Sequence, residues 1–180
     1  MRTHFVALTM ASLGLGLSAT TSGAETSTAS PPPELKQFDW FLGTWKCTGT
    51  TFASPMEKEH ATESTLTIQN DLDGFWQSFT IEEAKTAANP TPVKGAGYGG
   101  YDRALKKFVR VGFNNHGQWS SWTSTGWAGD RVVFVGAAGA KDVQLRQTIT
   151  KKGDNAFDSV VEAKGAGGKW AKAAETSCKK

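Results

Sequence analysis

The stretch ELKQFDWFLGTWKCTGTTF at residues 34–52 contains the change of periodicity that decides the fold. In its first half, Leu35, Phe38 and Phe41 recur at a spacing of three residues, which predicts a short amphipathic helix over 34–41. From Gly43 onward the pattern changes to a period of two, which is typical of a β-strand. The same alternation of Thr, Val, Phe and Trp with other residues recurs to the end of the chain.

These alternating runs predict ten strands, at 43–52, 60–69, 74–84, 94–101, 107–114, 118–127, 131–137, 142–151, 155–163 and 168–178. Clusters of Gly, Asn and Asp between the runs have the chemistry of hairpin turns. Connections this short pair neighbouring strands antiparallel, and closing the sheet on itself removes both exposed edges. We therefore expect an all-β fold, a ten-stranded antiparallel up-and-down barrel with a short N-terminal helix.

Composition and charge exclude several classes of protein. The chain has 180 residues, of which 38% are hydrophobic, and a formal net charge of +3 from 20 basic and 17 acidic residues. The basic residues are spread along the chain, whereas nucleic-acid binding needs a clustered basic face, so we expect no nucleic-acid partner. No apolar stretch reaches the roughly 20 residues of a transmembrane helix, so we expect no transmembrane segment.

The first 24 residues have the features of a secretory signal peptide. Arg2 precedes an apolar stretch at 5–17, and Ser22-Gly23-Ala24 places small residues where a signal peptidase cleaves. We therefore expect a signal peptide at 1–24 and a location outside the cytoplasm, either periplasmic or secreted. The polar, proline-rich segment 25–33 is expected to be a flexible linker, and 34–180 the barrel domain.

The two cysteines lie in the first and last predicted strands. Cys47 is near the beginning of strand 43–52 and Cys178 is at the end of strand 168–178. In a closed barrel with an even number of strands these two strands are antiparallel neighbours, which brings both cysteines to one rim. A disulfide needs this proximity and an oxidising compartment, so we expect a Cys47–Cys178 bond; two buried free thiols are the alternative.

Several motifs resemble known families. Gly43-Thr44-Trp45 after a short helix resembles the G-x-W signature of lipocalins and the wider calycin superfamily, in which the Trp closes one end of the barrel. The segments at 38–45 (FDWFLGTW), 72–76 (LDGFW), 100–102 (GYD) and 122–127 (WTSTGW) resemble an exported bacterial family within the calycins, domain of unknown function fifteen-seventy-nine. The resemblance implies a calycin-like barrel with Trp45 as its closing residue, and no established activity.

Small barrels either fill their interior with side chains or keep room for one ligand. Hydrophobic parity, with Trp45 taken as inward, predicts that the inward residues include His60, Thr62, Ser64, Leu66, Ile68, Phe75, Gln77, Phe79, Ile81, Val109, Val111 and Phe113. The polar members gather near one end of their strands, which favours a cavity with aromatic walls and a polar mouth; an open hydrated rim is the alternative. The candidate ligand-binding residues are His60, Gln77, Phe79, Tyr98 and Phe113.

The resulting hypothesis is an exported, non-catalytic barrel that binds a small lipophilic molecule, apolar or amphipathic, in its interior. The alternatives are an enzyme that uses His60 or His116 at the barrel mouth, and a structural envelope protein with a filled core. We expect no metal site or cofactor. No cysteine pair has zinc spacing, and the G-x-G-x-x-G at 95–100 does not open a helix. Nitrobindin, a barrel of similar shape, carries haem on a late His, and this chain has none after His116.

Overall fold

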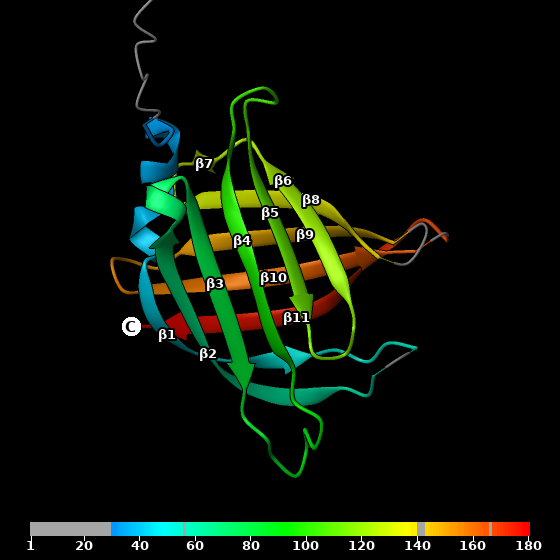
Figure 1. Ribbon diagram of the computed structural model, residues 1–180. Coiled ribbons are helices and arrows are strands. Elements are labelled where there is room, and N and C mark those ends of the chain that lie inside the picture. Colours follow the sequence, from blue (N-terminus) through cyan, green and yellow to red (C-terminus); the bar gives the residue numbers. More distant parts are fainter. Residues whose placement is uncertain (1–29, 56, 140–142, 166) are drawn as a thin grey trace, which may run out of the picture.

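Ten strands pair in chain order around a closed antiparallel barrel (Figure 1). The computed structural model describes residues 30–55, 57–139, 143–165 and 167–180. The ten barrel strands are β1 (Gly43–Thr51), β2 (His60–Asp71), β3 (Trp76–Glu83), β4 (Lys94–Asp102), β5 (Lys107–Asn114), β6 (Trp119–Ser124), β8 (Arg131–Ala138), β9 (Gln144–Lys151), β10 (Ala156–Lys164) and β11 (Trp170–Lys179). A short additional strand, β7 (Trp127–Ala128), pairs with β8.

Two pairings close the barrel. β1 pairs with β11, and β6 pairs with β8, so the predicted ten-stranded up-and-down barrel is confirmed. The predicted signal peptide at 1–24 and most of the predicted linker at 25–33 lie outside the described residues. Among the residues that the structure does describe, no helix has the length and hydrophobicity to span a membrane.

The predicted strand at 118–127 is interrupted, which gives the short additional strand β7. Gly126 breaks it with a φ of +99°, a conformation that other residues rarely adopt. A Cβ atom at this position would also lie 2.9 Å from Cε2 of Phe108. The break turns Trp127 toward the N-terminal helix, where its Nε1 donates a hydrogen bond of 3.0 Å to the carbonyl oxygen of Gln37.

The helix before β1 differs in type from the predicted one. Residues Pro33–Phe41 form a 3-10 helix, η1, where the sequence predicted a short amphipathic helix over 34–41. A 3-10 helix has about three residues per turn, so a spacing of three places Leu35, Phe38 and Phe41 on one face. All three are buried. A second, three-residue 3-10 helix, η2 (Leu72–Gly74), joins β2 to β3.

η1 lies against one end of the barrel and closes it with aromatic side chains (Figure 1). Trp45 is fully buried there, and its Nε1 donates a hydrogen bond of 2.7 Å to the carbonyl oxygen of Phe41. The Trp45 ring packs on Phe157 at 4.9 Å and on Trp40 at 5.1 Å between ring centroids. The aromatic core of the protein is therefore a plug at this end, which we call the closed end.

A disulfide joins the first and last strands near the closed end. Cys47 and Cys178 are directly opposite each other in the β1–β11 register, and their Cα atoms are 4.1 Å apart. Both cysteines are buried. The predicted Cys47–Cys178 bond is thus present, and it links positions that are 131 residues apart in the chain.

Gly97 in β4 is expected to tolerate no side chain. A Cβ atom there would lie 2.1 Å from the carbonyl oxygen of Val111 and 2.4 Å from Cζ of Phe79. Because the first of these atoms belongs to the backbone, no change of rotamer relieves the overlap. We expect Gly97→Ala to lower the free energy of unfolding by about 1–3 kcal/mol, as for other overpacked sites, measured by urea denaturation.

Gly99, two residues further along β4, provides the matched control. Its Cβ atom would meet no other residue closer than 3.7 Å. Gly99→Ala should therefore leave stability within about 0.5 kcal/mol of the parent, as substitutions without a strained contact usually do. Equal losses for the two variants would contradict the proposed cause.

Candidate functional site

The interior of the barrel contains a cavity of about 780 Å³. Protein interiors are otherwise close-packed, with few voids larger than one water molecule, so a space of this size is not a packing defect. It falls within the roughly 300–1,000 Å³ typical of small-molecule sites. Its walls are mainly apolar and include Leu66, Ile68, Phe79, Ile81, Phe108, Trp122, Phe134, Leu145, Ile149, Phe157 and Val161.

The two ends of the cavity differ. At the closed end Phe38 and Phe41 of η1 form the floor. At the other end, which we call the mouth, the lining comes from the ends of β5 and β8, the start of β6 and the turns beside them. Phe113 and Trp119 lie at this mouth and are 56% and 54% exposed. The mouth therefore combines exposed aromatic rings with the polar side chains of Asn114 and Gln118.

A row of polar side chains crosses the cavity near its floor. Nη2 of Arg110 in β5 donates a hydrogen bond to Oε1 of Gln147 in β9. Nε2 of Gln147 in turn donates to Oγ of Ser159 in β10 at 2.8 Å. Because β6 and β8 separate β5 from β9 in the sheet, the Arg110 side chain must reach across the interior.

Aromatic rings surround the Arg110 guanidinium. Its Cζ lies 4.6 Å from the ring centroid of Phe134, 5.2 Å from that of Trp122 and 5.9 Å from that of Phe79. Burial lowers the pKa of Arg110 to about 10, which leaves the side chain charged at neutral pH. Cation–π contacts with these rings compensate part of the lost hydration.

The chain matches one family model over nearly all of the residues described. Residues 30–180 match the model of a protein of unknown function, DUF1579. The chain belongs to the DUF1579 family. The predicted resemblance is confirmed, and no curated protein sequence is significantly similar to this chain.

Solved structures of distant sequence share the barrel fold of this DUF1579 protein. The crystal structure of Rv2717c from M. tuberculosis has a TM-score of 0.66 at 16% identity, and the match covers 84% of this chain and 99% of that one. The S-type phycobiliprotein lyase CPES from Guillardia theta has a TM-score of 0.52 at 12% identity, with 83% and 98% covered. At such low identity these similarities establish the fold alone.

The inward face of β5 in the DUF1579 barrel differs from the predicted one. Hydrophobic parity placed Val109, Val111 and Phe113 inside. Val109 and Phe113 border the cavity, but Val111 is 48% exposed and does not line it. The inward face instead carries Phe108 and Arg110. Parity was misleading because this strand has apolar residues on both faces, and Arg110 points inward among them. Sequence reasoning therefore missed Arg110 and its partner Gln147.

The other predicted ligand-binding residues are divided between the cavity and the rest of the barrel. Gln77 and Phe79 line the cavity, and Nε2 of Gln77 lies 3.4 Å from Oδ1 of Asp39 and from Oδ1 of Asn70. Phe113 borders the mouth. Tyr98 is 41% exposed and does not line the cavity. A hydrogen bond from its hydroxyl to the Asp71 carboxylate raises the pKa of Tyr98.

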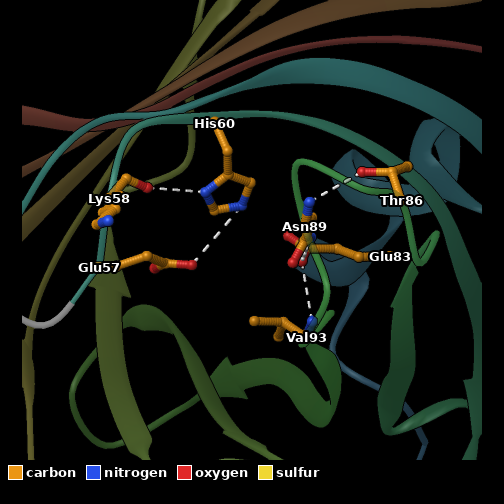
Figure 2. A network of polar contacts seen from close by, with 7 residues as sticks. All are labelled: Glu57, Lys58, His60, Glu83, Thr86, Asn89 and Val93. Carbon is orange, nitrogen blue, oxygen red and sulfur yellow. Dashed lines mark hydrogen bonds and ion pairs between the residues drawn. The ribbon is translucent and has the colours of Figure 1, made fainter.

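His60 lies at the mouth end of β2 but does not line the cavity (Figure 2). Its Nδ1 is 2.9 Å from the carbonyl oxygen of Lys58, and its Nε2 is 3.7 Å from Oε1 of Glu57. Figure 2 also shows Glu83, which accepts hydrogen bonds of 2.9 Å from Nδ2 of Asn89 and the backbone N–H of Val93. These contacts hold the loops beside the mouth.

His116, the remaining histidine candidate, does not line the cavity. His116 lies in the turn between β5 and β6, where its backbone N–H donates a hydrogen bond of 3.0 Å to Oδ1 of Asn114. Within the described ranges, no group of three or more His, Cys, Asp or Glu side chains is placed to hold a metal ion. The arrangement is suited to enclosing a molecule with an apolar body and at least one polar group.

Proposed function

We propose that this DUF1579 protein binds a small apolar or amphipathic molecule in the interior of its barrel. The observation that carries the proposal is the cavity of about 780 Å³, which has an aromatic floor and mainly apolar walls. Burying apolar ligand surface against such walls is favourable in proportion to the area removed from water. Gln77 and the Arg110–Gln147 pair supply the few polar groups that orient a bound molecule.

The alternatives considered from the sequence have less support. A filled-core structural protein would not contain a space of this size. An enzyme based on His60 or His116 would need that residue to face the bound molecule, and neither lines the cavity. We also propose that the protein is exported, since the Cys47–Cys178 disulfide is typical of oxidising compartments.

A neutral fluorescent probe tests interior binding. We expect N-phenyl-1-naphthylamine to bind saturably, with a rise in probe fluorescence. Ile81 lines the cavity, and Ile81→Trp should fill part of it and weaken binding by roughly tenfold or more, which corresponds to about 1.4 kcal/mol. The affinity is measured by titration of the full chain, after circular dichroism has shown that each variant is folded.

The neighbouring residue of β3 is the matched control for this test. Thr80 is exposed and does not line the cavity, so Thr80→Trp should leave the probe affinity unchanged. Absence of saturable binding to the parent protein would contradict the proposed function. Loss of binding with Thr80→Trp but not with Ile81→Trp would place the site on the outer surface instead.

A further inference from the structure

We propose that the molecule held in the barrel is a monoanion, a carboxylate with an apolar body, whose headgroup binds Arg110. This inference rests on the proposed function and specifies the chemistry of its ligand. Among the described residues that line the cavity, Arg110 is the only ionisable one. The other polar side-chain groups of this lining are amides, a hydroxyl and two indole N–H groups, so the part of the lining that the structure describes presents a single positive charge.

Arg110 has no carboxylate partner within the described part of the chain. None of the ion pairs found there involves it, and burial alone accounts for its lowered pKa. Arg146 of β9 shows the usual arrangement, because its Nε lies 2.7 Å from Oε2 of Glu162. A buried charge without a partner is costly, and such groups are normally paired. The site is thus electrostatically incomplete without an anion.

The guanidinium also has donors available. Gln147 accepts a hydrogen bond from Nη2, and it is the one acceptor found for this group among the described residues. The aromatic rings around Arg110 offer only their faces. Arg110 lines the cavity and is partly accessible, so the accessible part of the side chain faces the cavity. A carboxylate fits this group best, because its two oxygens match the guanidinium fork.

The depth of Arg110 determines how such a ligand would lie. Phe108, the preceding inward residue of β5, packs on Phe38 of the floor at 4.5 Å between ring centroids. Arg110 therefore lies one inward position above the floor. A headgroup bound there leaves the length of the cavity for an apolar chain, which extends between the walls to Phe113 and Trp119 at the mouth. In this orientation the carboxylate enters the cavity before the apolar chain.

The test compares ligands that differ only in the headgroup. Dodecanoate, 1-dodecanol and dodecyl phosphate compete with N-phenyl-1-naphthylamine for the full-length protein near neutral pH. We expect dodecanoate to bind roughly tenfold or more tightly than 1-dodecanol, as for a charge-assisted hydrogen bond. Dodecyl phosphate should bind less tightly than dodecanoate, because its second negative charge has no partner in the cavity.

Two variants assign the preference to Arg110. Arg110→Met should remove the preference, with dodecanoate weakened by roughly tenfold or more and 1-dodecanol unchanged. Arg146→Met, on the outer face and paired with Glu162, should leave both affinities as in the parent. If Arg110→Met does not fold, Arg110→Lys retains the charge and should keep a reduced preference for dodecanoate.

The outcomes separate this inference from the proposed function. Equal binding of dodecanoate and 1-dodecanol to the parent would overturn the anion inference and leave interior binding intact. Tighter binding of dodecyl phosphate than of dodecanoate would overturn the assignment to a monoanion. Failure of the naphthylamine probe itself to bind would contradict the proposed function.

Discussion

Replacing both cysteines of the Cys47–Cys178 disulfide with alanine is expected to lower the free energy of unfolding by about 5 kcal/mol. The bond links residues 131 positions apart, and closing so long a loop restricts the unfolded chain strongly in the chain-entropy model. The barrel should still form, because six residue pairs continue to join β1 to β11. Urea denaturation of the parent and of Cys47→Ala/Cys178→Ala measures the difference.

Reduction provides the control for the disulfide prediction. The parent protein with dithiothreitol should unfold at nearly the same urea concentration as the double variant, whereas the double variant should not respond to dithiothreitol. If the free energy of unfolding of the double variant is within about 1 kcal/mol of that of the oxidised parent, the disulfide contributes far less to stability than the chain-entropy model requires.

Trp45→Ala is expected to lower the free energy of unfolding by about 3–5 kcal/mol, the usual cost of removing a large buried aromatic side chain. Trp45 is fully buried in the plug and packs on Phe157 and Trp40. The substitution also removes the Nε1–H group, which leaves the carbonyl oxygen of Phe41 without that partner. Thermal and urea unfolding of the purified variant measure the loss.

Trp119 at the mouth supplies the comparison for Trp45, because its side chain is 54% exposed. Trp119→Ala should change stability by less than about 1 kcal/mol, as for most surface substitutions. Trp45→Phe keeps an aromatic ring but removes the hydrogen bond and part of the buried volume, and should cost an intermediate amount, about 1–3 kcal/mol. A small effect of Trp45→Ala would show that the plug does not hold the closed end.

The strands were predictable because their signals are local. Period-two alternation and the turn residues between runs placed all ten barrel strands close to their observed bounds, with the expected strand at 118–127 broken at Gly126. The disulfide followed from the same topology, since closure makes the first and last strands neighbours. The type of the N-terminal helix was not predictable, because a spacing of three residues satisfies a short α-helix and a 3-10 helix alike.

The composition of the cavity was harder to predict because it depends on which face of each strand is inward. Gln77 and Phe79 were placed correctly because β3 alternates clearly. In β5 both faces are apolar, and Arg110 resembles an ordinary surface residue until the barrel closes around it. His60 was expected to contribute to a polar mouth, yet its strand begins beyond the cavity lining. The polar side chains of the lining are instead Gln77, Arg110 and Gln147 inside the barrel and Asn114, Gln118 and Ser120 at the mouth.

The two junctions that close the barrel differ in mechanical strength. The β1–β11 junction has six residue pairs and a covalent crosslink. The β6–β8 junction has four residue pairs, and the break at Gly126 interrupts it on one side. We therefore expect strand separation in the barrel wall to begin between β6 and β8. That junction includes Trp122, whose ring lies 5.2 Å from Cζ of Arg110, so the shorter junction of the barrel runs beside the one charged side chain among the described residues that line the cavity.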